Sequence, residues 1–406
     1  MAPEHVFGVQ ISNLNRIVLS QGLRAFAYGF TSVLLGHLLG RNGTSFIKVG
    51  FVLASIVLGA AISSMFLLKF GENLGRRKSY ALFYLLLAVS GLLVAIHPTT
   101  LVIVLIALTG VLSTDSNDNG PATTLEQTML AQGNHKASMS RIFGKYNGVA
   151  SLFGALGALV QGLLSNIHSF DNSYVGFVVL IPIGLTCAYL ALSLDMGVEA
   201  TDHNQNTYSI KNSPARSHIL QLSGLFSLDA AAGGLVSSSF LAYYLTTRYE
   251  ASGIALGNLF FATSILSAIS MFLAPLVADR IGLVGTMVGT HLVSNAFLIA
   301  AAFCGNFQLA IIFLLLRSTL SQMDVPTRQA LIAQVVPERD RLAAAAITNA
   351  SRYAVRPISP LAGALLQQVS IGMPLIACGG LKAIYDLGVL GWAKREGFLK
   401  RQLPES

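Results

Sequence analysis

Charged residues are scarce in this sequence. Only 11% of its 406 residues are Asp, Glu, Lys or Arg, whereas a typical soluble domain carries about 25%. Apolar residues make up 53% of the chain, and the longest polar stretch, 198–218, is only about as long as a loop, too short for a folded domain. The composition therefore excludes a soluble protein and predicts a membrane protein that crosses the bilayer several times.

Cysteines, nucleotide motifs and metal motifs are also few or absent. The three cysteines, Cys187, Cys304 and Cys378, lie far apart in apolar segments, so we expect packing thiols and no disulfide framework. No G-x-x-x-x-G-K-[ST] is present, which argues against an ATP-driven pump. The eight histidines show no H-x-x-x-H or H-E-x-x-H spacing, so we predict no enzymatic activity, no metal and no cofactor. Residues 1–16 lack the pattern of a cleavable signal peptide.

Long apolar segments fill most of the chain. A helix needs about 20 apolar residues to cross a bilayer, and twelve candidate segments meet this requirement, six on each side of the polar stretch. The predicted spans are 18–41, 46–70, 78–97, 100–127, 143–166, 173–195, 217–247, 254–278, 283–303, 306–331, 343–367 and 372–393.

The distribution of positive charge predicts the orientation of these spans. With a cytoplasmic N-terminus, most of the 26 lysines and arginines fall in cytoplasmic segments, and only Arg41 and Arg248 fall in outer loops. This bias is the one that cytoplasmic loops of membrane proteins carry. We therefore expect both termini in the cytoplasm of a plasma (inner) membrane protein. The net charge of +8 then reflects topology, and nucleic acid is not expected as a partner.

The two sets of six spans resemble each other in sequence. A shift of 202 to 207 residues aligns "LRAFAYGF" at 23–30 with "LDAAAGGL" at 228–235, and "FGENLG" at 70–75 with "VADRIG" at 277–282. It also aligns "EQTMLAQ" at 126–132 with "RQALIAQ" at 328–334. Two repeated bundles of six helices are typical of secondary transporters, which bind substrate between the halves.

Gly71-Glu72-Asn73-Leu74-Gly75-Arg76-Arg77-Lys78, between spans 2 and 3, resembles the loop signature of the major facilitator superfamily. It departs from that signature by having Asn73 at a position where a basic residue is expected. The resemblance covers the whole chain and implies an all-α fold of twelve helices in two pseudo-symmetric bundles. The corresponding divisions are 1–197, a cytoplasmic loop 198–216, and 217–406.

The resemblance also implies functional regions. Spans 1, 4, 7 and 10 would line the cavity, and the loop signature would form a cytoplasmic latch. The alternative for the arginines of the signature is that they only set topology. The predicted latch residues are Gly71, Glu72, Gly75, Arg76 and Arg77, together with Asp279, Arg280 and Gly282 of the second repeat.

Charged side chains inside the spans are costly and are usually paired or functional. Arg24 and Asp115 lie in spans 1 and 4, and the repeat matches them with Asp229 and Arg317 in spans 7 and 10, with the signs exchanged. We therefore predict two ion pairs, Arg24 with Asp115 and Asp229 with Arg317. The pairs either only hold helices together, or they open when the carboxylate is protonated and so couple transport to protons.

Other charged residues of the spans give further expectations. Arg352 and Arg356 lie one helical turn apart in span 11, so an anion should lie nearby: Asp324, Asp340 or an anionic substrate. The alternative is that these two arginines anchor the cytoplasmic end of the span. Lys382 and Asp386 are predicted to pair with each other in span 12. Glu126 and Arg328, which the repeat matches, could bridge the halves when the cytoplasmic side closes.

One polar stretch interrupts span 4 and matches a calcium motif. The pattern D-x-[DN]-x-[DN]-G-x5-E of an EF-hand loop is met by Asp115, Asn117, Asn119, Gly120 and Glu126. An EF-hand needs amphipathic flanking helices, whereas 101–112 is apolar on every face. We therefore interpret the stretch as the cytoplasmic half of span 4, bent at Gly120-Pro121. Asp115, Asp118 and Glu126 are then candidates for a cation or proton site.

These observations predict a secondary active transporter that moves a small solute by alternating access. Proton-coupled efflux is the leading expectation, because the family resemblance makes it the common case. Uptake or exchange of a small organic or inorganic anion is the alternative, motivated by Arg352 and Arg356. A calcium-responsive membrane protein is the alternative of another class. The expected partners are a small-molecule substrate, protons and the lipid bilayer, and we expect a monomer.

Overall fold

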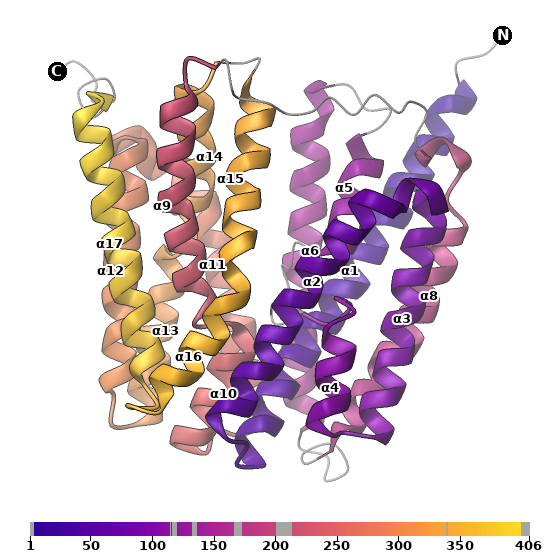
Figure 1. Ribbon diagram of the computed structural model, residues 1–406, viewed down its shortest axis with the longest axis horizontal. Helices are drawn as coiled ribbons and strands as arrows, with labels where there is room; N and C mark the ends of the chain where they lie inside the picture. Colours follow the sequence, from indigo (N-terminus) through magenta and orange to yellow (C-terminus); the bar gives the residue numbers. More distant parts are fainter. Residues whose placement is uncertain are drawn as a thin grey trace. The chain divides into compact units, whose positions relative to one another are not determined.

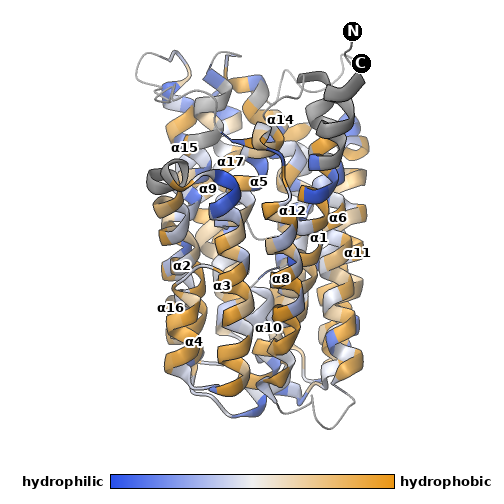
Figure 2. Cartoon of the chain, turned by 90° about the vertical axis from the view of Figure 1, so that its right-hand side faces the viewer, coloured by the Kyte–Doolittle hydropathy of each residue, from blue (hydrophilic) through white to orange (hydrophobic). Residues whose placement is uncertain are grey.

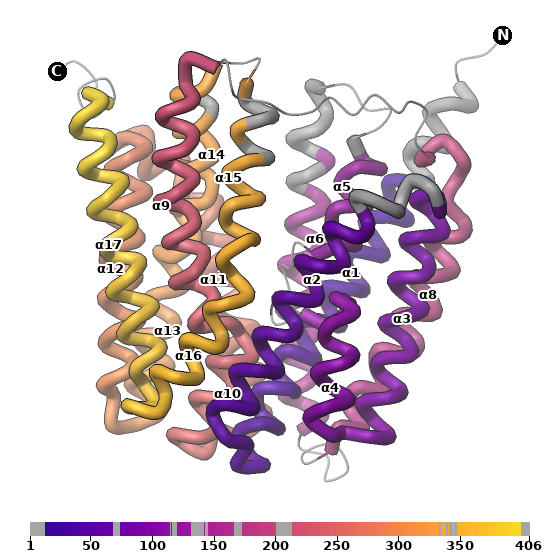
Figure 3. Tube along the Cα trace, in the orientation of Figure 1, coloured from indigo at the N-terminus to yellow at the C-terminus, as the bar shows by residue number. Residues whose placement is uncertain are grey.

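The computed structural model describes residues 4–113, 115, 120–131, 136–165, 173–199, 213–337 and 340–398. Figure 3 draws the remaining residues in grey, together with residues inside helices whose side chains are not described. Within the described part of the chain, all regular secondary structure is helical and no strand occurs. The fold is therefore all-α, as the composition predicts.

The first half of the chain contains six predicted spans, and each coincides with one helix or two consecutive helices (Figure 1). Span 4 is interrupted, and span 6 begins with a 3-10 turn that runs directly into its α-helix. The helices are α1 (Glu4–Arg41), α2 (Phe46–Leu74), α3 (Arg76–Ile96), α4 (Thr100–Ala107), α5 (Pro121–Ala131), α6 (Lys136–Leu164), η1 (Tyr174–Val179), α8 (Leu180–Leu192) and the short η2 (Met196–Val198).

The predicted spans of the second half are also helical, with interruptions in spans 7 and 10 and a 3-10 turn inside span 11. The helices are α9 (Arg216–Gly234), α10 (Ser238–Tyr249), α11 (Gly253–Ile281), α12 (Leu283–Phe303), α13 (Phe307–Leu320), α14 (Asp324–Val335), α15 (Arg341–Val355), η4 (Arg356–Ile358), α16 (Ser359–Gln367) and α17 (Met373–Arg395). Among the described residues, nine helical segments are long and apolar enough to cross a membrane.

The apolar surface fits a lipid environment. Large apolar side chains are exposed along the helices, including Phe272 at 82%, Leu101 at 67% and Phe66 at 63%. Apolar residues predominate along α3, α4 and α8, and polar residues gather toward the helix ends (Figure 2). Soluble monomers rarely expose so much apolar surface, so these faces indicate contact with lipid.

Span 4 is more strongly interrupted than the sequence predicted. Thr99 caps the start of α4 by accepting a hydrogen bond from the amide of Val102, and α4 ends at Ala107. The helix resumes only at Pro121, whose fixed φ suits the first position of a helix. In place of a bend at Gly120-Pro121, the chain therefore leaves the helical conformation before Asp115.

Contacts between residues divide the chain into two compact units. Unit 1 comprises Met1–Asn204 and Ser238–Phe261, and unit 2 comprises Gln205–Ser237 and Ala262–Ser406. The division predicted from the repeat places Ser238–Phe261 in the second half, whereas the contacts place this segment in unit 1. Span 7 is interrupted between Gly234 and Ser238, so its two helical parts belong to different units.

Small residues allow close helix packing in unit 1. A Cβ atom at Gly29 would lie 2.0 Å from the carbonyl oxygen of Gly154, and one at Gly157 would lie 2.1 Å from that of Phe26. The backbones of α1 and α6 thus touch directly, as small-residue interfaces of membrane helices permit. This packing brings the polar residues of α1 and α6 close to each other.

Unit 2 has a packed apolar core next to its polar residues. Phe226 of α9, Met287 of α12, Leu331 of α14 and Trp392 of α17 belong to one buried cluster, which also includes Tyr385. Helix α17 therefore packs against both α12 and α9 in this unit (Figure 1). The charged residues of these helices therefore lie beside an apolar core.

Candidate functional site

A buried ion pair joins the first and fourth spans in unit 1. The Arg24 guanidinium on α1 donates from Nη2 to Oε2 of Glu126 on α5, at 2.6 Å. Arg24 also donates to Thr123 Oγ1 at 3.0 Å and to the side chain of Gln21. The exposed fraction of Arg24 is 1% and that of Glu126 is 0%, so both charges are fully removed from solvent.

The Glu126 carboxylate accepts hydrogen bonds from three tyrosines as well. Tyr80 donates to Oε1 at 2.5 Å and Tyr84 donates to the same oxygen at 3.1 Å. Tyr146 of α6 donates to Oε2. A carboxylate has about four acceptor positions, and Glu126 uses all of them. This single anion therefore ties α5 to α1, α3 and α6.

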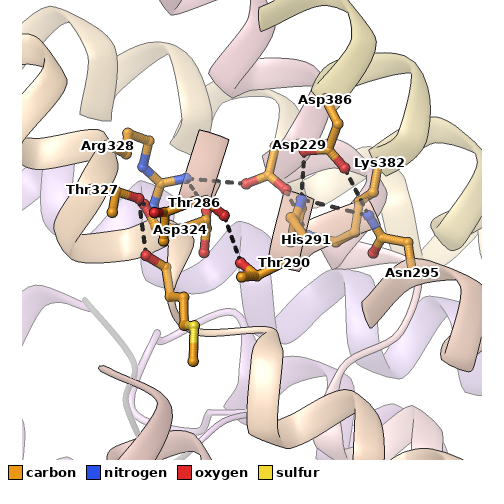
Figure 4. A network of polar contacts seen from close by, with 11 residues as sticks. Asp229, Thr286, Thr290, His291, Asn295, Asp324, Thr327, Arg328, Lys382 and Asp386 are labelled. Atoms are coloured by element: carbon orange, nitrogen blue, oxygen red, sulfur yellow. Dashed lines mark hydrogen bonds and ion pairs between the residues drawn. The ribbon is translucent and has the colours of Figure 1, made fainter. Parts of the chain in front are cut away.

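Unit 2 contains a longer network (Figure 4). Asp229 on α9 accepts from Lys382 Nζ of α17 at 2.6 Å and from Arg328 Nη1 of α14 at 3.3 Å. Arg328 also donates to Asp324, four residues earlier on the same helix, at 3.2 Å. The ion pairs thus join the seventh, tenth and twelfth spans.

A second group of polar contacts begins at Asp386, which lies four residues after Lys382 on α17. Asp386 Oδ1 lies 2.8 Å from Nδ1 of His291 on α12, and its Oδ2 accepts from Asn295 Nδ2 at 3.0 Å. The ring of Tyr385 meets the His291 imidazole edge-on, with centroids 5.9 Å apart. Asp386 is 0% exposed and His291 is 3% exposed, so this group also lies away from solvent.

The partners predicted for Arg24 and Asp229 were wrong. Arg24 pairs with Glu126 and not with Asp115, and Asp229 pairs with Arg328 and Lys382 and not with Arg317. The repeat matches Glu126 with Arg328. The exchange of charge sign between the two repeats therefore occurs, but at residues that lie one helical segment after Asp115 and Arg317. The reason is that spans 4 and 10 are both interrupted, after Ala107 and after Leu320, and the paired residues lie beyond the interruptions.

Asp115 has a different structural role. Its Oδ1 accepts from the amide of Ser238 at 3.1 Å and from Ser238 Oγ at 2.7 Å, so the carboxylate caps the N-terminus of α10. All of these atoms belong to unit 1. Asp118, the other candidate of this stretch, lies outside the described residues. The site predicted from Asp115, Asp118 and Glu126 stays a prediction; in the structure Glu126 accepts hydrogen bonds from Arg24 and three tyrosines.

The arginines of spans 10 and 11 were predicted to lie near anions. Arg317 on α13 and Arg352 on α15 form no ion pair with any described residue, and the Nε of each is buried without a hydrogen-bond partner. Arg356 begins η4 and is half-buried. The predicted pair of Lys382 with Asp386 was wrong, because Lys382 reaches across to Asp229 and Asp386 binds His291.

The loop signature adopts matching turns in the two repeats. Gly75 (φ 85°) precedes α3 and Gly282 (φ 78°) precedes α12, and both have the left-handed backbone that glycine favours. At the first turn, the amides of Arg76 and Arg77 donate to the Glu199 carboxylate at 2.6 and 3.2 Å. The sequence alone did not predict this role of Glu199.

The remaining predicted latch residues form no described ion pair. Asp279 and Arg280 are exposed at the end of α11. Gly71 and Glu72 lie within α2, and their side chains are outside the described part. The latch therefore stays a prediction, supported by the turn that Gly75 and Gly282 share.

Several residues of the two networks were missed from the sequence. Tyrosines 80, 84 and 146 are ordinary apolar-span residues by composition, and their common partner became visible only in the folded chain. His291 and Asn295 are one helical turn apart on α12, and Asp386 is a carboxylate in an apolar span. The carboxylate of Asp386 in an apolar span is a signal of a buried partner, but the spacing to Lys382 predicts a partner on the same helix, whereas the partners lie on α12.

Comparisons with known proteins match this architecture. A family model described as Major Facilitator Superfamily matches residues 17–228. An uncharacterized membrane protein of Saccharomyces cerevisiae is 24% identical, over 95% of this chain and 96% of its own length. The structure of the nucleoside transporter NupG has a TM-score of 0.71 at 13% identity, covering 94% of this chain and 99% of that chain. A D-xylose-proton symporter has a TM-score of 0.69 at 14% identity, covering 97% and 98%.

Proposed function

We propose, from the premise that this chain belongs to the Major Facilitator Superfamily, that it moves a small solute across the membrane by alternating access and uses the proton gradient to do so. It is a multi-pass membrane protein with the fold of secondary transporters. Efflux is the proposed direction, with both termini in the cytoplasm of the plasma membrane. The monomer is the proposed working form.

The matched ion pairs carry the proposal. Arg24–Glu126 and Asp229–Arg328 each join the first and fourth span of their own repeat, at equivalent positions and with opposite order of charge. Buried charges inside a membrane are expensive, and they are found mainly where an ion or proton pathway requires them. The presence of such a pair at equivalent positions of both repeats supports a role in transport beyond holding helices together.

Asp229 is the carboxylate best suited to take up a proton during transport. It bonds two cations, Lys382 and Arg328, and each cation has another carboxylate within reach, on its own helix. When Asp229 is protonated, Arg328 keeps Asp324 and Lys382 turns to Asp386. The two ion pairs that join α9 to α14 and α17 are then lost, which weakens the attachment of α9 to these helices during the transport cycle.

The test begins with a substrate found by growing a deletion strain against drugs, metals and carbon sources. Flux of that compound is then measured in proteoliposomes, with and without an imposed pH gradient. Wild-type protein should transport faster with the gradient. Asp229→Asn should retain gradient-independent exchange and lose the acceleration, and Asp229→Glu should keep part of it.

The control is Asp195→Asn, a residue outside both networks, which should respond to the gradient as wild type does. Unchanged acceleration in both Asp229 variants would contradict the proposed coupling. Flux that never responds to a pH gradient in wild-type protein would contradict proton coupling itself.

A second candidate, transport of a small anion, is favoured by Arg317 and Arg352. These two guanidinium groups have no ion-pair partner among the described residues, although each is held largely out of solvent. Guanidinium forks bind carboxylate and phosphate well. Binding of phosphate, acetate and benzoate, measured by thermal shift, should be lost in Arg352→Gln if the substrate is an anion. Equal shifts in both proteins would reject this candidate.

A further inference from the structure

Two Ser-Pro pairs occur in the sequence, and one of them lies where an enzyme could reach it. Ser359-Pro360 lies in α16, where both residues are buried. Ser213-Pro214 lies just before α9, near the end of the long polar stretch, with Pro214 exposed and Ser213 half-buried. Arg216, three residues after this serine, is exposed as well. The proposed transport cycle uses none of these residues.

The pattern Ser-Pro-x-Arg is typical of the substrates of proline-directed serine kinases. Proline has no amide hydrogen and disfavours a helical conformation of the residue before it, so Ser213 stays outside α9 and can enter an extended substrate groove. The guanidinium of Arg216 offers such an enzyme a charged group to bind with a carboxylate or phosphate. Ser359 has Ala362 at the corresponding position and lies within a helix. The local sequence and its exposure therefore favour Ser213 as the modified residue.

The Ser213 hydroxyl joins the start of α9 to the segment that precedes α15. It donates to Asp340 Oδ2 at 2.6 Å and accepts from the amide of Ala215 at 3.2 Å. Asp340 is the residue immediately before α15. Ala215 belongs to a buried apolar cluster formed by residues of α9, of α15 and of the end of α14. The hydroxyl therefore bridges two helices beside the cluster that packs their ends together.

A phosphate on Ser213 is incompatible with the first of these hydrogen bonds and compatible with the second. It replaces the hydrogen that Ser213 donates, and it carries a charge of about −1.5 to −2 near neutral pH, so it repels the Asp340 carboxylate. The amide of Ala215 can still donate to it, and an anion is favoured at the N-terminus of a helix such as α9. Phosphorylation would therefore break the contact with Asp340 and keep the contact with α9.

We propose that Ser213 is a phosphorylation site of a proline-directed serine kinase, and that its phosphate separates the start of α9 from the segment before α15. In this reaction Ser213 Oγ attacks the γ-phosphorus of ATP. The bond from Oγ to that phosphorus forms, the bond from the phosphorus to the oxygen that bridges to the β-phosphate breaks, and ADP leaves with this electron pair. The hydroxyl proton passes to the aspartate base of the kinase.

The modification would regulate transport through α9. This helix also carries Asp229, so a change at its first turn acts on a helix that the proposed proton coupling uses. The inference goes beyond the proposed function, because it concerns regulation. It relies on that proposal only in placing Ser213 in the cytoplasm, where ATP is present.

The first test locates the phosphate. Full-length protein in lipid nanodiscs is incubated with ATP and a proline-directed serine kinase, and the modified residue is identified by mass spectrometry. Wild-type protein should receive one phosphate on Ser213, and Pro214→Ala should receive much less. Ser217→Ala is the matched control, because Ser217 is exposed on the first turn of α9 and no proline follows it, so labelling should equal that of wild type. Nanodiscs expose both faces of the membrane, so the orientation of the spans does not affect the result.

The second test measures the separation of the two helices by hydrogen exchange before and after phosphorylation. The amide of Asp340 and those of the first turn of α15 should exchange about tenfold faster in phosphorylated protein, the factor that corresponds to loss of a hydrogen bond to a charged group. In Asp340→Asn the like charge is absent and the side-chain amide can donate to the phosphate. Phosphorylation of this variant should therefore change exchange at α15 much less.

Wild-type protein that receives no phosphate on Ser213 would overturn the inference, and so would equal labelling of Pro214→Ala and wild type. Phosphorylation of Ser213 without faster exchange at α15 would reject the separation of the helices, as would an equal change in Asp340→Asn. None of these results depends on the transported solute or on a pH gradient, so failure of this inference is distinguishable from failure of the proposed function.

Discussion

In unit 1 a single carboxylate, Glu126, gathers one arginine and three tyrosines, and its acceptor positions are filled. In unit 2 the equivalent position is Arg328, which shares two carboxylates, and Asp229 shares two cations. The first arrangement has one set of partners. In the second, Asp229 and Arg328 each have two ion-pair partners, so one bond of either residue can break while the other remains.

This difference suggests distinct roles for the two halves of the repeat. A saturated network resists change, because any rearrangement leaves a buried charge or hydroxyl without a partner. A network with spare partners can switch between arrangements of similar energy. Unit 2 is therefore the half in which the proposed proton coupling would act.

The largest expected effect is at Glu126. Glu126→Gln removes the charge that compensates Arg24, which leaves a buried guanidinium alone and should cost about 3–5 kcal/mol of stability. The measurement is the apparent unfolding temperature of the purified protein. The double variant Arg24→Met with Glu126→Gln should recover much of the loss, and equal stability of single and double variants would contradict the ion-pair explanation.

A smaller loss is expected at Asp229. In Asp229→Asn, Arg328 keeps Asp324 and Lys382 can turn to Asp386, so the cost should be about 1.5–3 kcal/mol, the value of charged hydrogen bonds. The comparison with Glu126→Gln under identical conditions is the measurement. An Asp229→Asn protein less stable than Glu126→Gln would refute the view that unit 2 has spare partners.

The two signature glycines should respond alike. Gly75→Ala and Gly282→Ala each place a side chain on a left-handed backbone, at φ 85° and φ 78°, which costs roughly 1–2 kcal/mol. Thermal unfolding of both variants tests this equality. Gly285→Ala within α12 is the control and should be neutral or slightly stabilising; a large difference between the first two would break the structural match of the repeats.

The smallest effect concerns the cap of α10. Asp115→Ala removes the acceptor of the Ser238 amide and hydroxyl, and loss of a helix cap costs about 1 kcal/mol. Asp115→Asn keeps an acceptor oxygen and should lose less. Proteolysis or hydrogen exchange at α10 measures the effect locally, and unchanged protection in Asp115→Ala would show that the cap contributes nothing.

Much of the fold could be predicted from the sequence. Low charge and long apolar segments determined a multi-span helical protein, because the bilayer permits only structures that satisfy their own backbone hydrogen bonds. The repeat predicted that Arg24 matches Asp229 and that the signs are exchanged. Each of the twelve predicted segments coincides with one helix or consecutive helices.

The partners of the charges were decided by the tertiary structure. Residue spacing places Asp386 beside Lys382, but the ammonium of Lys382 bonds Asp229 of another helix. Likewise, the interruptions of spans 4 and 10 set which charge of each span faces Arg24 or Asp229. The sequence by itself identifies the apolar helical segments, because their composition suits the bilayer. The pairing of their charges depends on helix breaks and on which helices pack together, and these are properties of the folded chain.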